Sequence, residues 1–209
     1  MNSALNAAAR LLQAEGVEFP PGVAEGIDRH LGLIREWNRV ASLVSTGDAD
    51  RLMEEHVVDS LSLAALVNRW AGDGGWLLDI GSGAGFPAIP IGLVLPRLRI
   101  SLVERSERKC GFLRKVVAAL GLAEVTVLTG EFPRVGGAAD ADVITARAVE
   151  KPAKVLRSVL DAMGDSSVFL CQSGDPRQAV GGGYQILEVD DGWTREGLRR
   201  GRLFEVRRA

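Results

Sequence analysis

The sequence has little of what metal, redox and membrane proteins need. Its two cysteines, Cys110 and Cys171, lie far apart and form no C-x-x-C pair, so we expect reduced thiols. Its two histidines, His30 and His56, show no metal-ligand spacing, and we expect no metal site. No apolar stretch reaches the ~18 residues that cross a bilayer. Residues 1–15 are amphipathic rather than signal-like, which favours a cytoplasmic protein.

The chain also lacks a strong excess of charge of either sign. Lys and Arg number 25 and Asp and Glu 27, a net charge of −2, which does not by itself indicate a nucleic-acid-binding protein. The end of the chain differs, because arginines crowd residues 195–209. They could contact the phosphates of an RNA, or they could form a solvated face on the last strand. These arginines are Arg195, Arg199, Arg200, Arg202, Arg207 and Arg208.

The pattern of apolar residues changes near residue 70. Before it, helical spacing recurs in residues 5–12, 23–37 and 52–66, which predicts three helices. After it, short apolar strands alternate with helices, and this predicts a mostly parallel sheet covered by helices on both faces. We expect strands at 77–80, 99–104, 125–128, 143–146, 167–171, 184–189 and 203–207, with the last two paired, and helices at 89–95, 107–120 and 152–163.

At 209 residues, with 46% hydrophobic and 25% charged side chains, the chain is long enough to bury one substantial core. We therefore expect a single globular unit, in which a helical segment, residues 1–70, packs on an α/β domain, residues 71–209. A monomer is the simplest oligomeric state for such a chain.

The most informative segment is WLLDIGSGAGFP, residues 76–87. An apolar run breaks into three alternating glycines, Gly81, Gly83 and Gly85, just before a helix, which predicts a strand, a tight turn and a helix start. The spacing is G-x-G-x-G rather than the G-x-G-x-x-G of dinucleotide folds, and the Lys and Ser/Thr of a P-loop do not follow. A pyrophosphate ligand is therefore the weaker candidate.

Two carboxylates stand near the ends of the first two predicted strands. In an open α/β sheet the ligand lies beyond the carboxyl ends of the strands, so Glu104 is placed to accept hydrogen bonds from a ribose diol. Asp79 should lie closer to the glycine loop, where its charge suits a cationic ligand. This combination favours S-adenosylmethionine, whose sulfonium is positive; the alternative is that Glu104 is merely solvated.

Two segments carry a family resemblance. LLDIGSGAGFPAIP, residues 77–90, and LVERSERKCGFLRKV, residues 102–116, are similar to the bacterial ribosomal RNA small subunit methyltransferase G family, also called glucose-inhibited division protein B. Further matches extend the likeness from about residue 37 to residue 148. They are Trp37-Asn38, Leu43, His56-x-x-Asp59-Ser60, Lys109, Phe112-Leu113-Arg114, Glu131-Phe132-Pro133 and Thr145-Ala-Arg147-Ala148.

The resemblance implies a Rossmann-like class I S-adenosylmethionine-dependent methyltransferase with a seven-stranded sheet and an N-terminal helical extension. It implies methyl transfer to N7 of one guanine, position 527, in 16S ribosomal RNA or the small ribosomal subunit. The expected cofactor-binding residues, taken from matching positions, are Asp79, Gly81, Gly83, Gly85, Phe86, Glu104, Gly130, Glu131 and Arg147, with Gly130 and Glu131 near the adenine. We assign no catalytic acid or base; Arg147, Asn38 and His56 are candidates for positioning.

Several roles stay open at this point. Arg147 follows a strand end, where its guanidinium could reach guanine or a phosphate, or could pair with Glu131 or Glu150. His56 is either a substrate contact or a buried helix residue that orients Asp59. Phe112 is expected in the core, and Lys109 and Arg114 face either RNA or solvent.

The chain also departs from the family pattern on the presumed substrate side. Members of the family usually read Asn-Leu-Thr where this sequence has Ser42-Leu43-Val44, and Lys-Gly where it has Ser173-Gly174. These departures concern the expected RNA contacts more than the reaction class. The competing hypotheses are another RNA target, a small-molecule or protein acceptor for the same cofactor, and a nucleotide-binding or regulatory module without chemistry.

Overall fold

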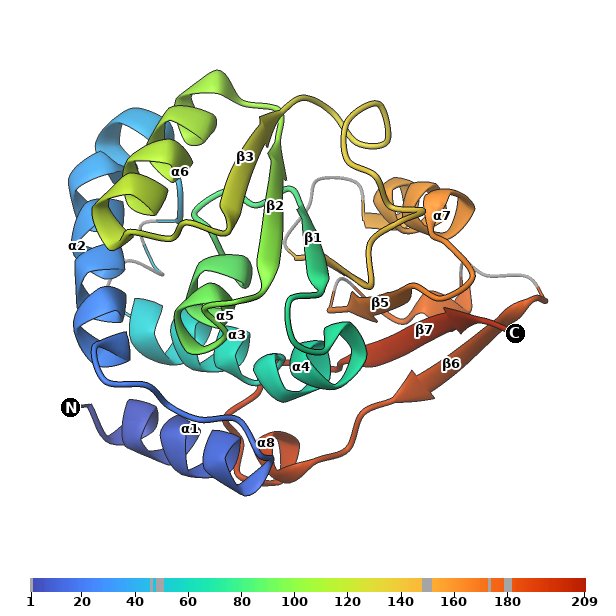
Figure 1. The fold of residues 1–209 in the computed structure, drawn as a ribbon, viewed down its shortest axis with the longest axis horizontal. Coiled ribbons are helices and arrows are strands. Elements are labelled where there is room, and N and C mark those ends of the chain that lie inside the picture. Colours follow the sequence, from blue (N-terminus) through green and yellow to red (C-terminus); the bar gives the residue numbers. More distant parts are fainter. Residues whose placement is uncertain (1, 46, 48–50, 148–151, 173, 179–181) are drawn as a thin grey trace.

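The computed structural model describes residues 2–45, 47, 51–147, 152–172, 174–178 and 182–209 (Figure 1). Its centre is a seven-stranded sheet in the order β3-β2-β1-β4-β5-β7-β6. The predicted strands all form, with bounds that shift by a residue or less. They are β1 (Trp76–Ile80), β2 (Arg99–Glu104), β3 (Val125–Thr129), β4 (Val143–Ala146), β5 (Val168–Cys171), β6 (Tyr184–Glu188) and β7 (Phe204–Arg208).

The sheet is mostly parallel, as the sequence predicts. Strands β1 to β5 pair in parallel, and β7 lies antiparallel between β5 and the edge strand β6. In the register of β1 and β4, Asp79 lies beside Thr145. From β1, the strand order runs outward to β2 on one side and to β4 on the other. The carboxyl ends of β1, β2 and β4 therefore meet at the switch point where open α/β sheets bind ligands.

Helices cover both faces of the sheet. Successive side chains of a strand point to opposite faces, so Leu77 and Leu102 join one apolar cluster and Leu78 and Val103 the other. Figure 1 shows α2 and α6 on one side and α7 on the other. The bounds are α2 (Val23–Ala41), α5 (Ala88–Val94), α6 (Glu107–Leu120) and α7 (Pro152–Ala162).

Residues on either side of position 70 share the larger apolar cluster. Leu5 of α1 (Ser3–Ala14) and Ile27 of α2 belong to it together with Leu77 of the sheet. The indole of Trp193, in the short helix α8 (Gly192–Arg195), donates to Glu15 Oε2 at 2.9 Å and closes the far end of the chain onto α1.

The third N-terminal helix is not continuous, which corrects the sequence prediction. A π-helix η1 (Met53–Val58) leads into α3 (Asp59–Leu61), and the chain turns before α4 (Ala64–Ala71). Here Ser60 Oγ donates to the His56 carbonyl and Ser62 Oγ to the Asp59 carbonyl. Serine hydroxyls that bind the carbonyls of their own helix compete with the regular ladder.

The loop after α2 has one strained residue. Ser42 caps the helix with φ 48°, in the left-handed region. Asn38 Oδ1 accepts hydrogen bonds from Leu43 N at 2.8 Å and Val44 N at 2.9 Å, which fixes the path of the chain beyond the cap. Asn38 therefore organises a loop.

We predict that Ser42→Asn stabilises the protein. Asparagine tolerates left-handed backbone better than serine, so the gain should be about 0.5–1 kcal/mol, or about 1–4 °C in Tm. Thermal unfolding followed by calorimetry measures it. Ser3→Asn, inside a helix and with no strain to relieve, is the control and should bring no gain. A Ser42→Asn protein with unchanged or lower Tm contradicts the assignment of strain.

Candidate active site

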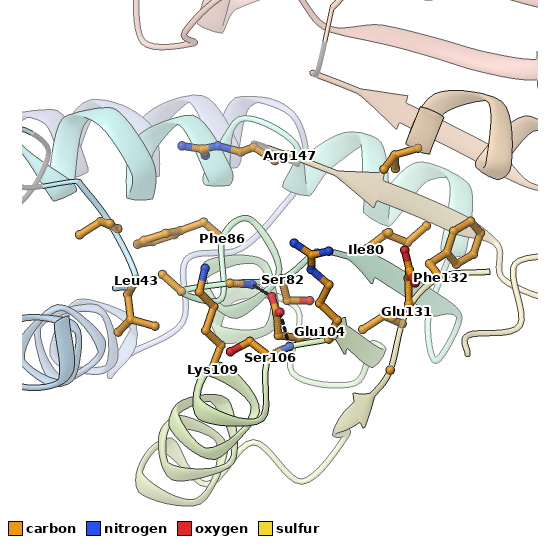
Figure 2. Close-up of a pocket in the computed structure, with 18 of the residues that line it drawn as sticks. Leu43, Ile80, Ser82, Phe86, Glu104, Ser106, Lys109, Glu131, Phe132 and Arg147 are labelled. Carbon is orange, nitrogen blue, oxygen red and sulfur yellow. Dashed lines mark hydrogen bonds between the residues drawn. The ribbon is translucent and has the colours of Figure 1, made fainter. Parts of the chain in front are cut away.

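A cavity of about 460 Å³ opens at the carboxyl ends of β1, β2, β3 and β4 (Figure 2). Four segments that follow these strands line it: the glycine loop, the turn after β2, the turn after β3, and Arg147 after β4. The volume falls in the range of small-molecule sites. Leu43 and Arg147, which stand 104 positions apart in the sequence, both line this cavity.

The glycine loop is held against β2. Gly81 N and Ser82 N both donate to the Val103 carbonyl, at 2.8 and 3.2 Å. Gly85, at φ 90°, must be glycine, since a Cβ there would come within 2.6 Å of Ile89 Cγ1. Gly83, at φ 52°, is different: a Cβ would meet only the Gly81 carbonyl oxygen, at 3.7 Å. The Gly83 backbone therefore faces open space in the cavity.

The Glu104 carboxylate lies at the centre of the cavity wall. Its Oε2 accepts from Gly83 N at 3.1 Å and its Oε1 from Ser106 N at 2.8 Å (Figure 2). A carboxylate has about four acceptor positions, so these two bonds leave capacity for two more donors. Glu104 is therefore held in place by the backbone and can still bind a pair of hydroxyl groups.

Asp79 does not line the cavity, contrary to the expectation that its charge lies beside a cationic ligand. Its side chain is fully buried, and Thr145 Oγ1 donates to Oδ1 at 2.7 Å. Within the described residues Oδ2 has no hydrogen-bond partner. Burial raises the pKa of the Asp79 carboxyl to about 7, and the Thr145 hydrogen bond offsets this only in part.

Arg147 is fixed by an ion pair that the sequence did not predict. Its NH1 lies 2.9 Å from Asp59 Oδ2, and its NH2 donates to the Glu55 carbonyl at 3.0 Å and to His56 Nδ1 at 2.6 Å. The predicted partner Glu131 instead lies 3.9 Å from Lys154. Glu150 falls outside the described residues.

Asp59 connects four segments of the chain. Besides Arg147, its carboxylate accepts from Gln172 Nε2 at 3.2 Å and from Arg200 N at 2.7 Å. Asp59 is 2% exposed, and removing one partner of a buried pair costs about 3–5 kcal/mol. Arg147, rather than His56, thus orients Asp59. His56 contacts Arg147 and lines the cavity.

His30 of α2 is a residue that the sequence analysis missed. It is fully buried, burial lowers its pKa to about 4, and its Nε2 lies 2.8 Å from the Ala84 carbonyl of the glycine loop. A neutral ring must donate through Nε2 to that oxygen. The ring centroids of His30 and His56 each lie 5.1 Å from that of Phe86. A polar residue three positions from Ile27 on an apolar helix face was the signal.

The remaining expected residues divide into two groups. Gly81, Gly83, Phe86, Glu104, Gly130, Glu131, Arg147 and His56 line the cavity, together with Leu43, Val44 and Lys109, whereas Asp79, Gly85 and Asn38 do not. Phe112 is fully buried, which confirms its place in the core, and Arg114 donates to Thr129 Oγ1 at 2.7 Å. Ala148 and Ser173 lie outside the described residues.

The arginines near the C-terminus are not a free basic tail. The Arg199 side chain is fully buried and lies 2.7 Å from Asp191, and Arg200 lies 2.7 Å from Glu55. Arg202 pairs with Glu188 at 2.5 Å, and Arg207 stacks over the Trp70 ring at 4.8 Å. Most of this charge is therefore balanced by neighbouring acids.

The described part of the chain lacks the features of two other kinds of site. It contains no group of three or more His, Cys, Asp or Glu side chains placed to hold a metal ion. None of its helices is both long and apolar enough to span a bilayer. Cys110 and Cys171 are both buried, and among the described residues neither forms a disulfide.

Comparison with known proteins identifies the family. The model of GidB, rRNA small subunit methyltransferase G, matches residues 24–178. The chain belongs to this family. A relative named ribosomal RNA small subunit methyltransferase G in Roseiflexus sp. (strain RS-1) is 37% identical over 66% of this chain and 59% of its own length. Its namesake in Chromobacterium violaceum is 33% identical over 76% of this chain and 74% of its own length.

Solved structures of lower identity share the fold. A mutant of MtNAS in complex with S-adenosylmethionine is 18% identical, with a TM-score of 0.58 over 90% of this chain and 73% of that chain. P. horikoshii TYW2 in complex with MeSAdo is 13% identical, with a TM-score of 0.53 over 72% of this chain and 60% of that chain. The fold is thus the Rossmann-like class I methyltransferase fold.

We predict that Asp79→Asn changes how stability depends on pH. The folded pKa of about 7 exceeds the ordinary value of 3.8, so between these values the folded state holds a proton that the unfolded chain has lost. Stability is therefore lost as the pH rises from about 4 to about 7, by at most about 1.4 kcal/mol per unit. Asparagine lacks this loss, and the Tm of Asp79→Asn should rise relative to the parent across that window.

Calorimetry at several pH values measures this gap in Tm. Asp140→Asn, at an exposed position, is the matched control, and its gap from the parent should stay constant. A constant gap for Asp79→Asn as well contradicts the raised pKa.

Proposed function

We propose that this protein transfers a methyl group from S-adenosylmethionine to N7 of a guanine in 16S ribosomal RNA, guanine 527 by family resemblance. The observation that carries the proposal is the pairing of Glu104 with Gly83 at the switch point of a sheet in a chain of this family. The curated relatives carry the name of an rRNA small subunit methyltransferase, and two solved neighbours are complexes with S-adenosylmethionine or MeSAdo.

The residues present fit the cofactor. The two open acceptor positions of Glu104 match the two hydroxyls of a ribose. Gly83 leaves room for close approach of the ligand, because no side chain projects from it. Gly130, Glu131 and Phe132 then line the neighbouring wall, where the adenine would lie.

The reaction requires positioning of the two reactants more than it requires proton transfer. When bound, S-adenosylmethionine supplies the methyl: its sulfur–carbon bond breaks, a carbon–N7 bond forms, and the positive charge passes to the base. N7 already carries a free lone pair, so no side chain has to act as a general base. Holding the two reactants in line can contribute roughly 7–11 kcal/mol.

The walls of the cavity also carry charge suited to RNA. Arg105, Lys109 and Lys154 line it along with Arg147, against the two carboxylates Glu104 and Glu131. Cationic side chains at the mouth of a site contact phosphates and set the position of the RNA. This charge supports an RNA acceptor over a small neutral metabolite.

The test is methyl transfer from labelled S-adenosylmethionine to small subunits, bare 16S RNA and a pool of cell metabolites. We expect label at N7 of one guanine in the RNA. Label only on metabolites, or on another RNA, contradicts the proposed acceptor, and no label on any acceptor contradicts the proposed reaction.

We predict that Gly83→Asp abolishes both cofactor binding and methyl transfer. The protein should still fold, because a Cβ fits at this position and aspartate tolerates left-handed backbone. The new carboxylate would project toward the cavity next to Glu104 and repel it. Calorimetric titration with S-adenosylmethionine measures the loss.

Gly121→Asp is the matched control for this change. Gly121 also has a positive φ, 64°, and open space around it, but it caps α6 away from the cavity. Its variant should bind and transfer normally. Equal affinity in the Gly83→Asp protein and the parent would place the cofactor elsewhere.

A further inference from the structure

The cavity extends beyond the part that the cofactor needs. Figure 2 shows Glu131 and Phe132 on one side of Glu104, and Leu43, Phe86 and Lys109 on the other. In the proposed function the adenosine occupies the first side. The second side is left for another ligand. It is formed by the loop after α2, the π-helix η1 and the starts of α5 and α6.

The second side offers a flat apolar surface. Leu43 and Val44 line it, and the rings of His56 and Phe86 stack at 5.1 Å with an angle of 20° between their planes. Aliphatic and aromatic side chains of this kind bind the faces of unstacked bases. An acceptor base extruded from RNA meets this requirement.

The charged side chains on this side are cationic. The two carboxylates that line the cavity, Glu104 and Glu131, lie at its centre and at the opposite side (Figure 2). Arg147 is committed to Asp59 and to the carbonyl of Glu55. For the Lys109 ammonium, by contrast, no hydrogen bond or ion pair is found within the described residues.

We propose that Leu43, Val44, His56, Phe86 and Lys109 form the subsite of the acceptor base, and that Lys109 selects guanine by donating to its O6. An ammonium group only donates hydrogen bonds. Guanine presents two acceptors, N7 and O6, on the edge that is methylated, whereas adenine presents the N6 amine beside N7. Lys109 therefore favours guanine and leaves N7 free to react. This inference rests on the proposed function.

The test compares guanine with 2-aminopurine at the target position of reconstituted small subunits. 2-Aminopurine keeps N7 but lacks O6. We expect the parent to prefer guanine in kcat/KM, and Lys109→Met to reduce that preference by about tenfold, the discrimination typical of one good base contact. Because both proteins meet the same two bases, the intrinsic reactivity of N7 cancels from the comparison.

Three controls keep the result specific. Lys109→Arg retains a cationic donor and should restore most of the preference. Lys115→Met, on the exposed face of the same helix, should behave as the parent does. The affinity of Lys109→Met for S-adenosylmethionine should stay within about twofold of the parent value, since one rim charge contributes little.

The outcomes separate the two proposals. An unchanged preference for guanine in Lys109→Met overturns the role of Lys109, while methyl transfer by the parent still supports the proposed function. If the parent binds S-adenosylmethionine but methylates no RNA, the proposed function fails and this subsite fails with it.

Discussion

The hydrogen bonds of the Glu104 carboxylate hold the site together. One oxygen binds the backbone of the glycine loop at Gly83, and the other binds Ser106 where α6 begins. Two segments that follow different strands are thus fixed to a single charged group at the end of β2. Because charged hydrogen bonds contribute roughly 1.5–3 kcal/mol each, this acid shapes the cavity before any ligand arrives.

The N-terminal helices supply a second set of constraints on the same loop. His30 binds the Ala84 carbonyl from α2, and its ring packs against Phe86, which in turn stacks on His56. His56 contacts Arg147, and Arg147 pairs with the buried Asp59. The helical segment before the sheet is therefore part of the cavity wall, and it contributes the apolar side where we place the acceptor base.

Local patterns in the sequence predicted the sheet, the glycine loop and the position of Glu104, because strand ends and turns are determined by neighbouring residues. The partners of Arg147 could not be predicted, since Asp59 stands 88 positions earlier and reaches it only through the fold. The burial of Asp79 was missed for the same reason: its Thr145 neighbour comes from the adjacent strand. The apolar periodicity also did not reveal the π-helix that interrupts residues 52–66, because a single extra residue barely disturbs the spacing of the apolar side chains.

The most direct test of the central claim is the affinity of the parent and of Glu104→Gln for S-adenosylmethionine and for its 2′,3′-dideoxy analogue. If Glu104 binds the ribose hydroxyls, the parent should prefer the natural cofactor by about 10-fold or more, and Glu104→Gln should lose most of that preference. Thermal unfolding of the variant checks that it still folds. The same preference for the hydroxylated ligand in both proteins would contradict the account.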